Sequence, residues 1–563
     1  MSVKHLVLRG VQLGRSLLHS GLLNPAARAA ARLGGERLRV TPLGRAAQPR
    51  SLLPARYRYY RVSLRGLAAQ LQSRAVRRLL GVASPRNRAV FLAFGLGAGL
   101  VEQQLQEERA GSAACRDIQA LFKKKKLQNP FRSFNSGYKL DEYVIGKQIG
   151  KGCNAAVYEA AAPFAIPRES ERCSLLEQKD AEPCVTRSVA DFPLAVKMMW
   201  NIGAGSSSEA ILNSMSQELV PACPKALEEE NGANTLHGHF GNVPKRVSPH
   251  PNVITVYRAF TADVPLLPGA QEEYPDVLPP RLNPAGMGNS RTLFLVMKNY
   301  PYTLRQYLEV SVPSKKEGTL MVLQLLEGVD HLCRQGIAHR DLKSDNVLVE
   351  LDSGGCPRLV ITDFGCCLAE TDLGLKLPFN SRCVNRGGNA CLMAPEVATA
   401  VPGPGVVIDY SKADAWAVGA IAYEIFGQRN PFYTTGPNGL DSRKYEEKQL
   451  PLLPSYVPTD TRVVVRLLLR RNPNRRPSAR VAANMLHVSL WGGQAWAHQD
   501  WASLKKMADW LLCQSAVVLL NGRSPSRSTV EPELQRCFLA NIKLEELRAA
   551  VGFLIFGREQ YSF

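Results

Sequence analysis

The sequence contains no Cys-x-x-Cys pair, and its thirteen cysteines, an odd number, are spread from Cys115 to Cys537. This pattern argues against a zinc ribbon and against a small disulfide-linked scaffold, so we expect reduced thiols. Hydrophobic residues make up 45% of the chain and charged residues 21%. Such a composition is globular, which excludes wholesale disorder and a collagen-like or coiled-coil design.

Acidic residues are almost absent from the first part of the chain, where Glu36 is the single acid in residues 1–101. Seventeen arginines and one lysine give that segment a charge of +17, whereas residues 102–563 carry only +4 of the total of +21. The folded bulk is therefore close to neutral. We expect no nucleic-acid partner for it, because a phosphate backbone is bound through clustered basic residues.

Residues 1–88 are rich in Arg, Ala and Leu, and the first turns place Leu and Arg at helical spacing. An Arg-rich, acid-poor amphipathic leader is typical of a mitochondrial transit peptide. The alternative is a disordered basic arm that binds RNA. Lysine is nearly absent and no aromatic stacking platform is interleaved, which favours targeting.

Residues 89–101 form an apolar run between Arg88 and Glu102. Thirteen helical residues span about 20 Å, less than the about 30 Å of a hydrocarbon core, so a buried core helix is one interpretation. Three glycines weaken an isolated helix, and we favour a short, marginal membrane segment. A polar helix is predicted over residues 102–127, within a linker that extends to residue 142.

A strand-like segment from Tyr143 leads into a glycine-rich turn, G-x-G-x-x-A, which begins at Gly150. Two glycines let a backbone lie close to phosphate oxygens without a Cβ clash. The candidate nucleotide-binding residues here are Ile149, Gly150, Lys151, Gly152 and Val157, with Ala195 and Lys197 in the next strand-like run.

Ser206 and Glu209 have the spacing of a capping box and predict the start of an amphipathic helix. Glu209 and Glu218 are both candidates for an ion pair with Lys197. An unmodified Ser206 can serve as the cap of this helix.

Five further motifs follow in order. They are His339-Arg-Asp341 with Lys343 and Asn346, Asp363-Phe-Gly, Ala394-Pro-Glu396, Asp414-Ala-Trp416, and Arg476. This series, over residues 143 to about 490, resembles the eukaryotic-type protein kinases.

The resemblance implies an α+β, bilobal kinase fold with N-lobe insertions, an N-lobe over residues 143–299 and a C-lobe over 300–490. It implies Asp341 as the catalytic carboxylate, Lys343 as the lysine that steadies the transferring phosphate, and ATP with Mg²⁺ held by Asn346 and Asp363. Lys197 would hold the nucleotide phosphates and pair with Glu218, which we choose because the family's glutamate comes from mid-helix. A scaffolding pseudokinase is the alternative, but these residues are all present.

Several stretches, at residues 88–97, 197–202, 206–218, 296–301, 363–369 and 409–416, are similar to the mitochondrial kinases of the Parkin and ubiquitin mitophagy pathway. That resemblance implies phosphorylation of a serine of ubiquitin and of Parkin's ubiquitin-like domain. It implies residence at the outer-membrane translocase on damaged mitochondria. In healthy mitochondria it implies import to the inner membrane, cleavage by a rhomboid protease between Ala93 and Phe94, and a cytosolic cleaved form.

The same resemblance makes Ser206 an autophosphorylation site, with Ser381 in the activation segment as a second candidate and a transient homodimer for phosphorylation in trans. Insertions are expected at residues 163–192, 221–250 and 262–290, the last of which contacts ubiquitin in the family. Residues 491–563 predict a helical extension packed on the C-lobe and on the polar helix. A catalytically dispensable adaptor at the mitochondrial surface is the alternative function.

Overall fold

The structure is a computed structural model that describes residues 108–123, 135–163, 192–227, 245–433, 439–492, 504–521 and 528–561. The chain divides into two units, residues 1–100 and 101–563, and all of the described residues belong to the second. The expected targeting segment 1–88, the apolar segment 89–101 and its cleavage residues Ala93 and Phe94 lie outside the described residues. Most of the first expected insertion does so too.

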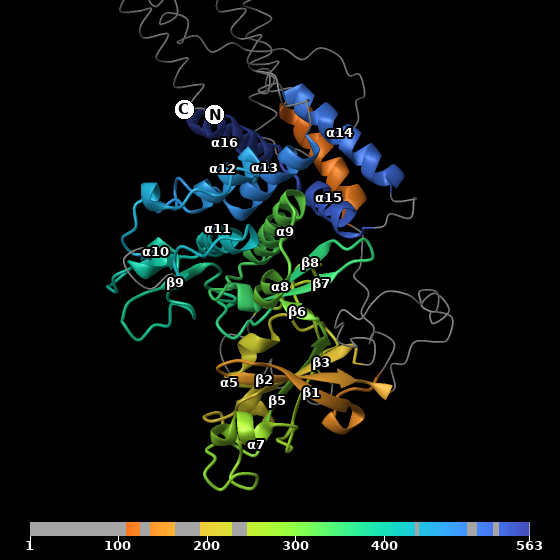
Figure 1. Cartoon of the computed structure of the whole chain (residues 1–563), viewed down its shortest axis with the longest axis vertical. Helices are drawn as coiled ribbons and strands as arrows, with labels where there is room; N and C mark the ends of the chain where they lie inside the picture. Colours follow the sequence, from red (N-terminus) through yellow and green to blue (C-terminus); the bar gives the residue numbers. More distant parts are fainter. Residues whose placement is uncertain are drawn as a thin grey trace, which may run out of the picture. The chain divides into compact units, whose positions relative to one another are not determined.

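A five-stranded antiparallel sheet forms the N-lobe (Figure 1), with strand order β1-β2-β3-β5-β4. Its strands are β1 (Val144–Lys151), β2 (Ala155–Ala161), β3 (Leu194–Met199), β4 (Val256–Asp263) and β5 (Arg291–Lys298). The β1–β2 hairpin is closed by a hydrogen bond from the Gly152 N–H to the Ala155 carbonyl (2.9 Å). The glycine-rich segment is therefore the tip of a hairpin.

The inner strands β2, β3 and β5 are buried on both faces of the sheet, whereas β1 has no buried residue. Alternate residues of a strand point to opposite faces. In β3, Ala195 and Met199 face a cluster with Ile211 and Leu219, whereas Val196 and Met198 face a second cluster with Tyr274. The first cluster is covered by α5 (Ser208–Ser214) and the 3₁₀ turn η4 (Ser216–Leu219). The second is covered by the insertion between β4 and β5, which contains α7 (Ala270–Glu273) and η5 (Pro275–Val277).

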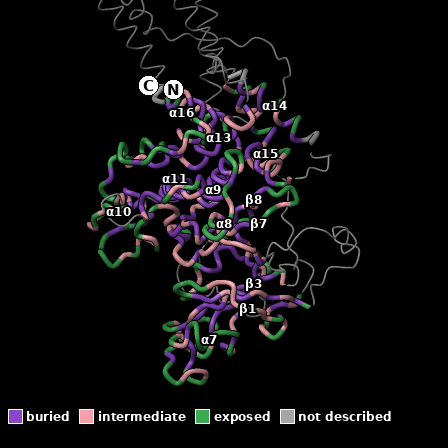
Figure 2. The backbone as a smooth tube through the Cα atoms, in the orientation of Figure 1, coloured by how far each residue is buried: buried purple, intermediate pink, exposed green. Residues whose placement is uncertain are grey.

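The C-lobe is mostly helical and is built around α9 (Lys315–Arg334) and α11 (Ala413–Ile425). Figure 2 shows both helices as largely buried. Around them lie α8 (Leu304–Val310), α10 (Pro395–Ala398), α12 (Thr459–Leu468) and α13 (Ala479–Trp491). A small sheet of β6 (Tyr302–Thr303), β7 (Val347–Leu351) and β8 (Pro357–Ile361) faces the N-lobe, with η6 (Ser344–Asn346) before it. The short strand β9 (Lys376–Pro378) lies within the activation segment and pairs with β10 (Val407–Asp409), which follows it. The turn η7 (Glu447–Gln449) precedes α12.

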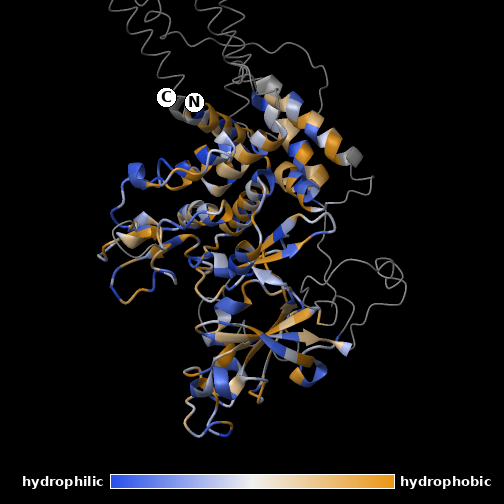
Figure 3. Ribbon diagram, in the orientation of Figure 1, coloured by the Kyte–Doolittle hydropathy of each residue, from blue (hydrophilic) through white to orange (hydrophobic). Residues whose placement is uncertain are grey.

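Three helices, α14 (Leu504–Asn521), α15 (Val530–Asn541) and α16 (Leu544–Tyr561), follow the C-lobe. Hydrophobic residues run through these helices (Figure 3), where α16 packs on α12 and α13, and α15 packs on α9. The predicted polar helix is helical over residues 108–122. Its Glu108 forms an ion pair with Arg548 of α16 (3.0 Å), and its Cys115 and Ile118 are buried. No helix of the described segments has both the length and the apolarity to cross a membrane.

Two details of the predicted helix near Ser206 were wrong. The residue that caps α5 is Ser207, whose Oγ accepts a hydrogen bond from the Ala210 N–H (3.2 Å), so the cap lies one residue after the predicted capping box. Glu218 lies in the separate turn η4 and not in mid-helix, because the α-helical bonding of α5 ends at Ser214. Ser206 itself is exposed and precedes the cap.

Candidate active site

Lys197 on β3 lies at the centre of a buried group of charges between the lobes. Its Nζ contacts Glu218 Oε2 at 2.9 Å and Oε1 at 3.1 Å, and it contacts Asp363 Oδ1 at 2.9 Å. Burial alone would lower the pKa of Lys197, but the attraction of Glu218 and then of Asp363 outweighs it and raises that pKa. The lysine is therefore held as a cation. Glu209 is exposed and has no bond to Lys197 in the described structure.

The two acidic partners of Lys197 differ in their surroundings. Burial raises the pKa of Glu218 despite the opposing effect of Lys197. Burial would also raise the pKa of Asp363, but Lys197 and then His339 and Lys343 lower it by more. The carboxylate of Asp363 therefore remains ionised. Its side chain is 43% exposed, against 8% for Glu218. Asp363 is thus the member of the pair that is accessible to a bound cation.

Asp363 stands on a backbone that L-residues rarely adopt, with φ of +66°. The next two residues hold it there. Phe364 is buried in the same cluster as Leu219 and stacks edge-on to His339 at 5.1 Å. A Cβ at Gly365 would lie 2.7 Å from Glu218 Oε1, so glycine is required for the close approach of these segments.

Asp341 belongs to the catalytic loop between α9 and η6. Its Oδ2 accepts a hydrogen bond from Asn346 Nδ2 (2.9 Å) and contacts Lys343 Nζ at 3.2 Å, whereas its Oδ1 is buried and has no partner. A buried acceptor without a partner is rare in native proteins. The unused oxygen can therefore accept a proton from a substrate hydroxyl.

The backbone of this loop is fixed by a residue to which the sequence analysis gave no role. Asp414, at the start of α11, accepts hydrogen bonds from the backbone N–H of His339 (2.7 Å) and of Arg340 (3.0 Å). Arg340 has a left-handed φ of +64°, and its side chain donates to the carbonyls of Cys366 and Asn385. The Asp-x-Trp motif marks Asp414 in the sequence. It does not reveal the role of this residue, because His339 and Arg340, to which Asp414 is hydrogen-bonded, lie 75 and 74 positions earlier.

The glycine-rich hairpin and the floor below it supply apolar surface. Ile149, Val157 and Ala195 belong to one cluster, and Leu348 of β7 joins it from the C-lobe. Leu348 was missed because an alternating strand residue carries no motif. Apolar walls of this kind suit the flat face of a nucleotide base.

The donor set also fits a divalent cation. Asn346 uses its Nδ2 for the Asp341 carbonyl and carboxylate, which leaves its amide oxygen for a metal, and Asp363 adds a partly exposed carboxylate that also contacts Lys197. Mg²⁺ prefers such oxygen ligands and keeps several waters and substrate phosphates. No compact cluster of three or more His, Cys, Asp or Glu is found among the described residues.

Glu396 and Arg476 form a bidentate ion pair, with Nη1 at 2.6 Å and Nη2 at 2.9 Å from the two carboxylate oxygens. Arg476 is buried and anchors the end of the activation segment. Ser381, the second candidate phosphorylation site, is exposed within that segment.

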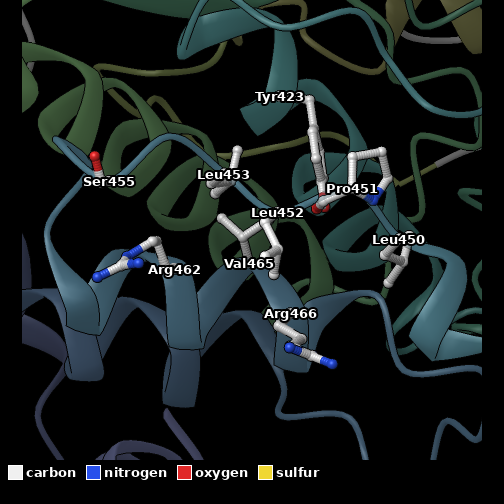
Figure 4. Close-up of a pocket in the computed structure, with 9 residues that line it drawn as sticks. All are labelled: Tyr423, Leu450, Pro451, Leu452, Leu453, Ser455, Arg462, Val465 and Arg466. Carbon is white, nitrogen blue, oxygen red and sulfur yellow. The ribbon is translucent and has the colours of Figure 1, made fainter. Parts of the chain in front are cut away.

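A cavity of about 320 Å³ lies between the end of α11, the loop 450–455 and α12 (Figure 4). Its wall is formed by Tyr423, Leu450, Pro451, Leu452, Leu453, Ser455, Arg462, Val465 and Arg466. It includes none of the predicted site residues. The active site is therefore assigned from the geometry around Lys197 and Asp341 and not from this cavity.

Comparison with known proteins agrees with this geometry. The protein kinase domain family matches residues 197–488. The chain is 55% identical to the mitochondrial serine/threonine-protein kinase PINK1 of Rattus norvegicus over 98% of this chain and 99% of that protein. It is 55% identical to that of Homo sapiens with the same coverage. It is 38% identical to that of Tribolium castaneum over 87% of this chain and 84% of that protein.

These matches confirm the bilobal kinase fold and the serine/threonine kinase activity expected from the motifs. The relatives are also named as mitochondrial, as the leader composition predicts. The chain belongs to the protein kinase family and, within it, to the PINK1 family of mitochondrial serine/threonine kinases.

Proposed function

We propose that this kinase transfers the γ-phosphate of Mg-ATP to a serine of ubiquitin and of the ubiquitin-like domain of Parkin, and so marks damaged mitochondria for mitophagy. The observation that carries the catalytic part is the assembled set of Lys197, Glu218, Asp363, Asp341 and Asn346. The substrate part rests on the similarity to the PINK1 family and on the sequence stretches shared with that pathway.

The chemistry assigned to the chain follows from these positions. Asp341 accepts the proton of the serine hydroxyl at its unpaired Oδ1, while Lys343 neutralises charge on the transferring phosphoryl group. Lys197 binds the nucleotide phosphates. The bound Mg²⁺ neutralises phosphate charge, and Asn346 and Asp363 are the residues that would hold it.

We further propose that the insertion at residues 262–290 contacts the protein substrate. It is well formed here as α7 and η5, and it presents exposed Leu266 and Met287. Autophosphorylation in trans, within a transient homodimer, is assigned to Ser206 and Ser381, which are both exposed. A phosphate at Ser206 would add negative charge just before α5, where free N–H groups favour anions.

For location, we propose retention at the outer-membrane translocase of damaged mitochondria with the kinase domain in the cytosol. In healthy mitochondria the chain would be imported and cleaved by a rhomboid protease between Ala93 and Phe94. The basic, acid-poor character of residues 1–88 supports import.

The decisive experiment incubates the full-length kinase with ubiquitin and Mg-ATP and measures the intact mass of ubiquitin, with Asp363→Ala as the inactive control. A single added phosphoryl group made only by the wild type supports the proposal. Autophosphorylation without modified ubiquitin would refute the substrate and leave the kinase activity intact. Undiminished Parkin recruitment in cells by Asp341→Ala would instead favour the adaptor alternative.

A further inference from the structure

The insertion between β4 and β5 covers the outer face of the N-lobe sheet. Val264, Leu267, Ala270, Tyr274 and Leu278 are all buried against strand residues on that face. The insertion therefore shares a hydrophobic core with the sheet that carries the glycine-rich hairpin. A displacement of one requires repacking of the other, because protein interiors are closely packed.

Polar contacts tie the insertion directly to the glycine-rich segment. Lys151 lies between Gly150 and Gly152, and its Nζ donates to the backbone carbonyl of Glu273 (2.6 Å) and to Glu273 Oε2 (3.0 Å). The two side chains are 40% and 53% exposed. This ion pair is the link closest to the tip of the hairpin.

A second, buried link lies further along the hairpin. The hydroxyl of Tyr158 on β2 is hydrogen-bonded to the hydroxyl of Tyr274 (2.5 Å), and it also contacts the carbonyl of Pro268 and the side chain of Gln148 on β1. Tyr274 packs on Trp200 at 6.0 Å. The two strands of the hairpin and the insertion thus meet at one buried hydroxyl pair.

We propose that Glu273 and Tyr274 are positioning residues that clasp the glycine-rich hairpin and hold it in the place required for ATP binding. Glu273 acts through Lys151, and Tyr274 acts through Tyr158. Neither residue belongs to the kinase motifs. Both come from the insertion between β4 and β5, which contains none of the catalytic residues.

The physical basis is preorganisation. A glycine-rich loop that is mobile without nucleotide must lose conformational freedom when its backbone closes on the phosphates, and a clasp removes part of that cost before binding. Glycine at positions 150 and 152 increases the conformational freedom of this loop. Contacts from outside the loop therefore restrict its backbone more than they would restrict an ordinary loop. Losing the clasp should therefore weaken ATP binding and leave the phosphoryl-transfer step almost unchanged.

The test compares full-length Glu273→Gln with Glu272→Gln, which makes the same charge change at the adjacent exposed residue. In the described structure Glu272 has no bond to the hairpin. Direct binding of a non-hydrolysable ATP analogue with Mg²⁺ and the KM for ATP are measured, together with kcat and thermal stability. We expect Glu273→Gln to raise Kd and KM about two- to five-fold, the size of effect of a half-exposed ion pair, with kcat and melting temperature unchanged. Glu272→Gln should match the wild type.

Tyr274→Phe tests the buried link, since it keeps the ring against Trp200 and removes the hydroxyl. It should also raise KM for ATP with little change in kcat. The exchange Lys151→Glu with Glu273→Lys tests the side-chain ion pair. Each single change should weaken nucleotide binding, and the pair together should recover the part that depends on the ion pair, since a glutamate at position 151 cannot donate to the backbone carbonyl of residue 273.

Three results would overturn the proposal. The first is an unchanged Kd in both Glu273→Gln and Tyr274→Phe. The second is tighter ATP binding by Glu273→Gln, which would mean that Glu273 merely withholds Lys151 from the phosphates. The third is a fall in kcat and stability without a change in Kd, which would make the insertion a structural cover only. The Kd and the thermal stability are measured without a protein substrate, so they are independent of whether ubiquitin is phosphorylated.

Discussion

At the scale of single residues, two positions of the active site carry backbone strain. Arg340 and Asp363 have φ of +64° and +66°, values that cost about 1–3 kcal/mol each for residues other than glycine. The strain is held by Asp414 beneath the catalytic loop, and by the packing of Phe364 beside Asp363. It orients Asp341 and Asp363 before any substrate binds.

The role of Asp341 predicts a defect in chemistry and not in nucleotide binding. Asp341→Asn keeps the size of the side chain but removes the proton acceptor, so we expect kcat to fall by about 10²–10⁴-fold. KM for ATP should change little, because Lys197 and the glycine-rich hairpin are untouched. Steady-state kinetics on any accepted protein substrate would measure both constants, and a rise in KM with unchanged kcat would contradict the assignment.

The ion pair of Lys197 predicts a contrast between two glutamates. Glu218→Gln removes a buried partner at 2.9 Å from Lys197 Nζ, and we expect kcat/KM for ATP to fall at least about tenfold. Glu209→Gln makes the same change on exposed surface nine residues earlier, in α5, and should behave as the wild type. Equal activities for the two variants would show that the pair with Asp363 alone holds Lys197.

At the scale of elements, the C-terminal extension is attached to the C-lobe at the N-terminus of α15, where a residue from another part of the chain caps the helix. Asp352, in the turn between β7 and β8, accepts hydrogen bonds at Oδ2 from Ser528 Oγ and Thr529 N (both 2.8 Å) and from Val530 N (3.3 Å). These groups begin α15, whose own Thr529 provides no side-chain cap. The first turn of α15 therefore depends on a residue about 180 positions earlier in the sequence.

Removal of this cap should loosen the extension. Asp352→Ala is expected to destabilise the protein by about 1–2 kcal/mol, the range measured for helix caps, with Asp372→Ala as an exposed control. Urea unfolding gives the free energy, and hydrogen exchange should show faster exchange confined to α15 and its neighbours. Uniform exchange across the C-lobe would contradict a local role.

At the scale of the whole molecule, charge is divided unevenly along the chain. The basic leader contains +17 of a total of +21, so the kinase and its extension are nearly neutral. Within the described part of the C-lobe, one group of buried charges is paired around Arg480. Arg480 contacts both Glu327 and Asp330 at 2.6 Å, and His487 contacts Glu327 at 2.7 Å. A group of this kind is costly to break, because one lost partner leaves a buried charge uncompensated.

Three histidines packed around α9 predict a dependence of stability on pH. Burial lowers the pKa of His250, His331 and His487, and the rings of His250 and His331 stack at 4.4 Å. The fold therefore favours their neutral forms, whereas the unfolded chain takes up protons near pH 6.5. The stability they contribute is complete above about pH 6.5 and decreases as the pH falls below it, by about 1.4 kcal/mol per pKa unit for each histidine.

Melting temperatures measured between pH 7.5 and 5.5 would check this. The wild type should lose stability over that interval, and His331→Gln should reduce the slope because one titrating group is removed. Parallel curves for the two proteins would show that the loss comes from other groups.

The sequence by itself determined the kinase fold and the order of its catalytic motifs. Those motifs are local: Asp341, Lys343 and Asn346 lie within six residues of one another. Their spacing can therefore be read from the sequence without knowing how the core packs. The glycine-rich turn, Lys197 and Asp363 could be named for the same reason. The charge asymmetry of the leader is also a property of composition alone.

Only the tertiary structure decided which distant groups meet. It placed Glu218, the glutamate already chosen from the family resemblance, against Lys197 from a 3₁₀ turn and not from mid-helix. It moved the cap of α5 to Ser207, and it placed Asp414, Leu348, Asp352 and Glu273 beside segments remote in sequence. Each of these contacts depends on where a helix ends or on which face of the sheet an insertion covers. Those outcomes are set by packing of the whole core, which no local pattern of residues encodes.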